Sequence, residues 1–274
     1  MSVTLAAVQV LATDDRSDNL ARAARLVNEA ADRGADVIVM PEIFSAPFVA
    51  GDVDLDYFRW AEPLLTGPTN SLMAELSSSR GTTIVSSVFE AGEPSGVYFN
   101  TTVTFHHGAP VHVYRKSHLP FSNAFPEKFY FRPGQEAPSA VEVGDVMLGT
   151  IICYERHFPE LGRLVALAGG TVMAVPVACA SAPTREVFQL ELRAQAVFNE
   201  LFVVCANRVG TESGKTYYGT SAIYGPDGTV LAQASADSPE VVVAEVDPLA
   251  AVQRRHVLPF LRDRRPDLYG GLAD

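Results

Sequence analysis

Cys153 stands at a position suited to nucleophilic chemistry. It follows the apolar run Val146–Ile152 and precedes the polar residues 154–157. Such a change is typical of a strand that ends where a helix begins, and N–H groups at a helix N-terminus can stabilise a thiolate or an oxyanion. A buried structural cysteine is the alternative, because free cysteines are among the most buried residues.

The other two cysteines have surroundings of a different kind. Cys205 lies inside the apolar run 201–206, and Cys179 lies among small residues at 177–180. We expect core or pocket-lining roles for both. Three cysteines spread through the second half of 274 residues do not suggest a disulfide framework and fit a reducing compartment.

A thiol that attacks an amide carbon needs a base, an oxyanion stabiliser and a proton donor for the leaving amine. Glu42 follows the apolar stretch Asp36–Met40 almost directly, and burial at a strand end would suit it to general-base work. Lys116, where another strand gives way to a loop, could supply positive charge for the oxyanion. The alternative is a partly exposed loop residue for Glu42 and a solvated one for Lys116. His157 is expected to be solvated or to support the site rather than to act as the base.

Alternating strands and helices must position these groups. The expected strands cover residues 3–10, 36–40, 82–89, 97–105, 111–114, 146–153, 172–175, 202–206, 222–224, 230–234 and 241–246, and the expected helices cover residues 18–33, 70–79, 161–168 and 185–199. This order predicts a layered α/β protein with helices outside mixed sheets. Residues 119–139 are rich in Pro and aromatics with little period, and so long a loop in a compact domain is typically functional.

Composition favours one soluble globular domain over residues 1–274, since 47% of residues are apolar and 19% charged. A net charge of -11 without a dense run of Lys or Arg argues against nucleic acid as a partner. No apolar run reaches the roughly 18 to 20 residues that span a membrane, and no signal segment is recognisable, so we expect a cytoplasmic protein without a membrane partner. No CxxC, HExxH or histidine ligand set occurs, so no metal or other cofactor is expected.

Three segments, in order, resemble the Glu, Lys and Cys signatures of the nitrilase superfamily. They are Pro41-Glu42, residues 115–120 (RKSHLP) and residues 152–160 (ICYERHFPE). Residues 206–210 and 219–223 are similar to segments seen late in that family, so the resemblance covers nearly the whole chain. It implies a four-layer α-β-β-α sandwich that assembles as a homodimer or higher homo-oligomer. The tail from about residue 254 to 274 could be a subunit contact or a loose end.

The resemblance also implies a role for each residue. Glu42 would be the general base, Cys153 the nucleophile that forms an acyl-enzyme, and Lys116 the oxyanion stabiliser. The N–H of Tyr154 could complete the oxyanion site. In the stretch 125–134, where many members place a second glutamate that orients the substrate and hydrogen-bonds the lysine, Glu127 is the candidate.

The same stretch, which includes EKFYFRPG, is most similar to N-carbamoyl amide hydrolases. Arg156 matches an arginine of β-ureidopropionases and could pair with a substrate carboxylate, or it could form a structural ion pair as in other amidase branches. Residues 178–184 match no pocket motif. We predict an N-carbamoyl (ureido) acid amidohydrolase that releases ammonia and carbon dioxide. The alternatives are an aliphatic or ω-amide amidase, an amine-accepting acyltransferase and a non-catalytic binding protein.

Overall fold

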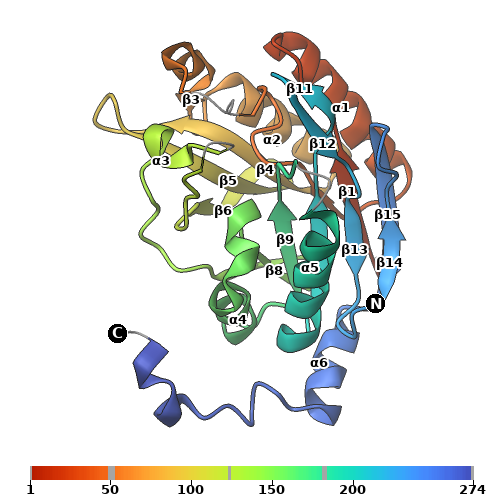
Figure 1. Cartoon of the computed structure of the whole chain (residues 1–274). Helices are drawn as coiled ribbons and strands as arrows, with labels where there is room; N and C mark the ends of the chain where they lie inside the picture. Colours follow the sequence, from red (N-terminus) through yellow and green to blue (C-terminus); the bar gives the residue numbers. More distant parts are fainter. Residues whose placement is uncertain (1, 49–52, 123–124, 181–183, 273–274) are drawn as a thin grey trace.

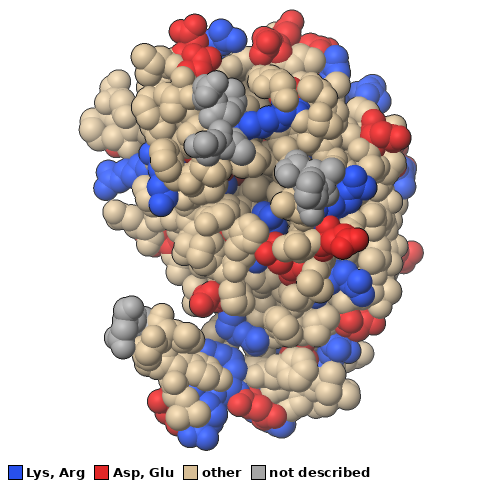
Figure 2. Space-filling model, viewed as in Figure 1, with Lys and Arg blue, Asp and Glu red and all other residues tan. Residues whose placement is uncertain are grey.

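Two β-sheets lie face to face, and helices cover the outer face of each (Figure 1). The computed structural model describes residues 2–48, 53–122, 125–180 and 184–272. Acidic and basic side chains are interspersed over the face shown in Figure 2, with basic ones gathered near the C-terminal segment.

The first sheet has the strand order β15-β1-β2-β4-β5-β6, with β3 also paired to β4. Its strands are β1 (Val3–Gln9), β2 (Val37–Val39), β3 (Glu62–Pro63), β4 (Thr83–Ala91), β5 (Tyr98–His106), β6 (Ala109–Arg115) and β15 (Glu240–Val246). β1, β2 and β4 run parallel, whereas β15, β5 and β6 add antiparallel edges. The expected hairpin at residues 97–114 is the β5–β6 pair.

The second sheet repeats this plan with the order β14-β13-β10-β9-β8-β7. Its strands are β7 (Ala140–Val143), β8 (Val146–Thr150), β9 (Val172–Pro176), β10 (Phe202–Ala206), β13 (Ala222–Tyr224) and β14 (Val230–Gln233). The central strands β8, β9 and β10 are parallel. A separate hairpin is formed by β11 (Val209–Glu212) and β12 (Lys215–Tyr218).

The alternation of side chains along the strands explains the layers. In β1, Leu5 and Ala7 pack in the core between the sheets, while Ala6 and Val8 pack under α1 (Arg16–Asp32) and α2 (Pro68–Arg80). The outer face of the second sheet is covered by α4 (Pro159–Leu167) and α5 (Arg185–Asn199). The fold is thus a four-layer α-β-β-α sandwich, and the prediction of fold class is confirmed.

Some elements differ from the expectation. The strand expected to reach Cys153 ends at Thr150, because Cys153 has a φ of +48° and begins the 3-10 helix η2 (Cys153–His157). The irregular segment 119–139 contains α3 (Glu127–Tyr130). Among the described residues, the other unpredicted helices are η1 (Leu55–Trp60), α6 (Leu249–Val257), η4 (Pro266–Leu268) and η5 (Gly270–Leu272).

The segment that follows α6 runs outside the sandwich (Figure 1). It leaves the apolar side chains of Phe260, Leu268 and Leu272 exposed. Within the described part of the chain, no helix has the length and apolar character needed to cross a bilayer.

Candidate active site

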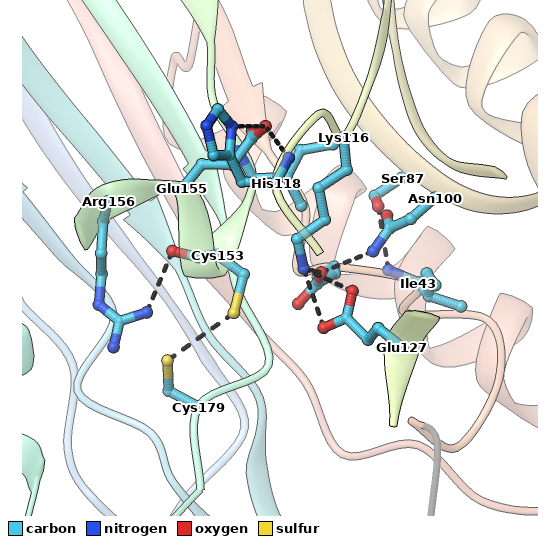
Figure 3. A network of polar contacts seen from close by, with 12 residues as sticks. Ile43, Ser87, Asn100, Lys116, His118, Glu127, Cys153, Glu155, Arg156 and Cys179 are labelled. Atoms are coloured by element: carbon cyan, nitrogen blue, oxygen red, sulfur yellow. Dashed lines mark hydrogen bonds and ion pairs between the residues drawn. The ribbon is translucent and has the colours of Figure 1, made fainter. Parts of the chain in front are cut away.

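A buried cluster of charges lies where β2 and β6 end and β5 begins, with α3 beside them (Figure 3). Lys116, directly after β6, donates to Glu42 Oε1 at 2.7 Å and to the two carboxylate oxygens of Glu127 at 2.9 and 2.7 Å. Asn100 of β5 donates from Nδ2 to the same Glu42 oxygen at 2.7 Å. All four side chains are almost inaccessible to solvent. The structure therefore brings together three of the residues singled out from the sequence.

Glu42 keeps one oxygen unoccupied within this cluster. Oε1 accepts from both Lys116 and Asn100, whereas Oε2 is buried and has no hydrogen-bond partner among the described residues. Buried polar atoms normally have hydrogen-bond partners, so an unpaired one is an indication of function. A carboxylate oxygen held in place with its lone pairs free can accept a proton from a reacting group.

The loop that carries Glu42 is fixed by Arg208, which follows β10 of the other sheet. Its guanidinium donates to the Glu42 carbonyl at 3.1 and 2.8 Å, to the Ala46 carbonyl at 2.9 Å, and to the Ile43 carbonyl. Glu212 neutralises the guanidinium in a buried ion pair. Ile43 has a φ of +45°, which is costly for a β-branched residue and persists only when its surroundings enforce it. These contacts supply that enforcement, so the position of Glu42 is rigidly specified.

Cys153 also has a strained backbone. Its positive φ turns the chain sharply between β8 and η2, so that the thiol is presented at the turn, as in a nucleophile elbow. The side chain is 7% exposed and opens into a cavity. In Figure 3 its sulfur lies between the Cys179 sulfur and the Lys116–Glu127 pair.

Glu155 joins the turn of Cys153 to the loop of Lys116. Its Oε2 accepts from the Ile152 N–H at 2.7 Å, and its Oε1 accepts from the Tyr114 hydroxyl and from the Ser117 N–H, each at 2.7 Å. Burial opposes ionisation of this carboxyl, but hydrogen bonds from His118, Ser117 and Tyr114 outweigh it and lower the pKa of Glu155. A charged Glu155 thus holds the turn that carries Cys153 next to the loop that carries Lys116, although β6 and β8 belong to different sheets.

The charges in the cluster compensate one another. Burial disfavours the ammonium of Lys116, but the carboxylates of Glu127 and Glu42 more than offset it, so the pKa of Lys116 is raised. Burial raises the pKa of Glu127 to about 7, against the opposing effect of Lys116. The pKa of Cys153 is raised by its contact with Cys179 and by burial. Cys153 is therefore held as a thiol that needs a base.

The raised pKa of Glu127 gives stability a defined pH dependence. Between the ordinary value near 4.5 and about 7, the folded chain binds a proton at Glu127 that the unfolded chain does not. Its contribution to stability is thus complete below about pH 4.5 and is lost as pH rises through about 7. We expect the unfolding free energy of Glu127→Gln, from urea titrations at pH 5 to 8, to fall less with pH than that of the wild type. Glu136→Gln, at an exposed residue, should follow the wild-type slope, and equal slopes for Glu127→Gln would contradict the assignment.

A cavity of about 380 Å³ lies in front of Cys153, with Glu127, Tyr154 and Arg156 in its wall. Much of the remaining wall is apolar, including Pro120, Phe121, Phe125, Ala178, Ala180 and Val187. Such a site, apolar with a few convergent polar groups, is typical for a small molecule. No cluster of three or more metal-ligating side chains occurs among the residues that the structure describes.

Arg156 is already engaged by protein groups. It forms an ion pair with Glu191 at 2.9 Å, donates to the Cys153 carbonyl at 3.0 Å, and lies over the Phe188 ring. His157 contacts the same Glu191 through Nδ1 at 2.6 Å, so this histidine supports the pocket wall and stands outside the charge cluster.

Several groups in the site were not singled out from the sequence. Asn100 was expected only as part of a strand, and Glu155 and Arg208 only as parts of matching segments. The sequence did contain a signal for such groups. It was a single amide or charged residue within or directly after a strand that is otherwise apolar or rich in Thr. Cys179, expected to line the pocket or core, has its sulfur 4.0 Å from that of Cys153.

Residues 4–255 match the family described as carbon-nitrogen hydrolase. The chain belongs to this family. The resemblance to the nitrilase superfamily is thereby confirmed, and so is the expectation of a hydrolase that acts on amides. Among curated relatives, N-carbamoylputrescine amidase of Solanum tuberosum is 35% identical, over 97% of this chain and 93% of that protein.

Two solved structures of carbon-nitrogen hydrolases extend the comparison. The carbon-nitrogen hydrolase from Helicobacter pylori G27 has a TM-score of 0.94 at 27% identity and covers 100% of this chain and 99% of its own. A mutant of the amidase from Nesterenkonia sp. AN1, solved with the acetamide moiety of fluoroacetamide added covalently at its active site cysteine, has a TM-score of 0.77 at 25% identity. That alignment covers 98% of this chain and 95% of the amidase.

Proposed function

We propose that this hydrolase cleaves N-carbamoyl (ureido) acids through a thioester on Cys153. The observation that carries the mechanism is the unpaired Oε2 of Glu42, in a buried cluster with Lys116 beside a cavity into which the thiol opens. A covalent adduct at the active site cysteine of the related Nesterenkonia amidase supports a cysteine nucleophile.

In the first half-reaction, the Cys153 sulfur attacks the ureido carbonyl carbon while Glu42 takes the thiol proton. Negative charge then develops on the carbonyl oxygen, where the ammonium of Lys116 and the N–H of Tyr154 would stabilise it. The tetrahedral intermediate collapses when Glu42 returns the proton to the leaving nitrogen. Ammonia departs and leaves a carbamoyl thioester on Cys153.

In the second half-reaction, Glu42 takes a proton from water, and the resulting hydroxide attacks the thioester carbon. The proton then goes to the departing Cys153 sulfur. The released carbamic acid breaks down to the amine and carbon dioxide. Glu127 accepts hydrogen bonds from Lys116 and faces the cavity, so it would orient both the lysine and the substrate nitrogen.

The charges of the pocket favour an acid over a diamine as substrate. Apart from Glu127, which is bound to Lys116, no carboxylate lines the cavity among the described residues, whereas Arg156 and His157 do. An ammonium at the far end of a ureido substrate would therefore meet no counter-charge. A carboxylate could pair with the guanidinium of Arg156, which lines the cavity beside its contacts with Glu191 and the Cys153 carbonyl.

A simple aliphatic amide is the second candidate, favoured by the apolar part of the cavity wall. The two are distinguished by ammonia release from N-carbamoyl-β-alanine, other N-carbamoyl amino acids, N-carbamoylputrescine, ω-amides and aliphatic amides. We expect the highest kcat/KM for an N-carbamoyl acid. Turnover of aliphatic amides alone would refute the proposal of a ureido substrate. A preference for N-carbamoylputrescine would refute the proposal that the substrate is an acid.

Arg156→Lys tests the proposed carboxylate contact, because a lysine keeps the charge but loses bidentate pairing. The KM for N-carbamoyl-β-alanine should rise about tenfold, as expected for loss of one charge-assisted hydrogen bond. The kcat/KM for a neutral amide should stay within about threefold. Equal losses for both substrates would show that Arg156 acts only through its contacts with Glu191 and the Cys153 carbonyl.

A further inference from the structure

A second sulfur lies next to the proposed nucleophile. The Sγ atoms of Cys153 and Cys179 are 4.0 Å apart, although the residues follow different strands, β8 and β9. Cys179 is held in place by Asn207, whose Oδ1 accepts from the Cys179 N–H at 2.9 Å. The proximity of the two thiols is thus built into the second sheet.

Both thiols open into the same cavity. Each is 7% exposed and belongs to the cavity wall, so a small polar oxidant that enters the substrate pocket can reach them. Cys205 has no exposed surface and does not line the cavity. The chain therefore contains a matched internal control, a third free cysteine in the core of the same sheet.

The chemistry of Cys179 suits reaction with peroxide. The hydrogen bond from Cys153 and the charge of Arg156 lower the pKa of Cys179 to about 7, although burial opposes the shift. A thiolate, and not a thiol, reacts readily with hydrogen peroxide. The proposed hydrolysis assigns Cys179 no step.

We propose that Cys179 and Cys153 form a reversible disulfide when the protein meets hydrogen peroxide. The Cys179 sulfur attacks one peroxide oxygen, the O–O bond breaks, and sulfenic acid and water form. The Cys153 sulfur then attacks the sulfenic sulfur, an S–S bond forms, and a second water leaves. Two thiols are oxidised by two electrons, and one peroxide is reduced to two waters.

The required movement is small. A disulfide has sulfurs about 2 Å apart, so the two sulfurs must approach by about 2 Å. The bond would block Cys153 as a nucleophile and protect it from further oxidation to sulfinic acid. The loss of turnover rests on the proposed function, whereas formation of the bond does not.

The test treats the full-length reduced protein with hydrogen peroxide, alkylates free thiols under denaturing conditions, and maps peptides by mass spectrometry without reduction. We expect a peptide that joins Cys153 to Cys179, with a mass about two units below the sum of the two reduced peptides. Dithiothreitol should remove both signals. Turnover should fall at least tenfold in step with the cross-link and return on reduction.

Cys205→Ala should give the same cross-link as the wild type, whereas Cys179→Ala should give none and should gain about 32 mass units at Cys153 under prolonged oxidation. The proposal is overturned if the wild type gains oxygen at either cysteine without the cross-linked peptide, or if both thiols stay alkylatable. Both outcomes are measured with the wild-type protein, so the test does not depend on whether Cys179→Ala folds. A cross-link in a protein that hydrolyses no amide would refute the proposed function and leave this inference standing.

Discussion

Replacement of Cys153 by Ala should lower kcat for every amide or ureido substrate by at least about a thousandfold, because the acyl-enzyme cannot form without the sulfur. The residual rate should be close to that of the substrate in buffer. Steady-state ammonia release measures the loss, and intact-protein mass spectrometry should find no acyl adduct. The variant should fold, since the change removes only one sulfur atom and its contact with Cys179.

Cys205→Ala is the matched control for this variant. Cys205 is equally a free cysteine of the second sheet, but it is fully buried and has no surface on the cavity. Its replacement should reduce stability slightly and keep kcat within about threefold. Appreciable turnover by Cys153→Ala, with a melting temperature like that of the wild type, would remove Cys153 from the mechanism.

Glu42→Gln should lower kcat by about 10² to 10⁴ with little effect on stability. The substitution keeps the shape of the side chain and leaves an oxygen that can accept from Asn100 and Lys116. What it removes is the basic oxygen, because an amide NH₂ at the position of Oε2 cannot take a proton. Single-turnover ammonia release should slow as much as kcat, since the same base serves the first step.

Glu62→Gln provides the comparison for Glu42→Gln. Glu62 is also a buried carboxylate of the first sheet, but it accepts from the Thr69 N–H and hydroxyl and does not line the cavity. Its replacement should change the unfolding free energy and leave kcat within about threefold. If Glu42→Gln retained activity to the same extent, the base would have to be another group.

Sequence reasoning located the cluster because strand ends can be recognised. Glu42 and Cys153 each follow an apolar run that stops abruptly, Lys116 follows a strand that gives way to a loop, and parallel strands deliver their carboxyl ends to one edge of a sheet. Glu127 depended on the family resemblance, since four residues of α3 leave no helical period to read. The layered fold was predictable for the same reason, because apolar runs mark the buried strands and the helical periods between them mark the covering helices.

The contacts that hold the cluster in place were harder to predict from the sequence. Whether Asn100 faces inward depends on the register of β5 against β4, and a one-residue shift would turn its amide to the other face. Arg208 and Glu155 bridge segments that are 166 and 38 residues apart, and no local pattern reports such pairs. The 4.0 Å approach of two cysteines likewise arises only when β8 and β9 lie side by side.

The site straddles the interface between the two sheets. Glu42, Asn100 and Lys116 belong to the first, and Cys153 belongs to the second. The hydrogen bonds that join the two include those made by Arg208 and Glu155. Neither half of the chain thus holds a complete set of reacting groups. A nascent chain that has emerged only as far as β6, or a fragment left by proteolysis between the sheets, would hold the proposed base without the proposed nucleophile. Activity therefore reports completed assembly of the whole sandwich, and recovery of turnover during refolding should lag behind the recovery of secondary structure in either half.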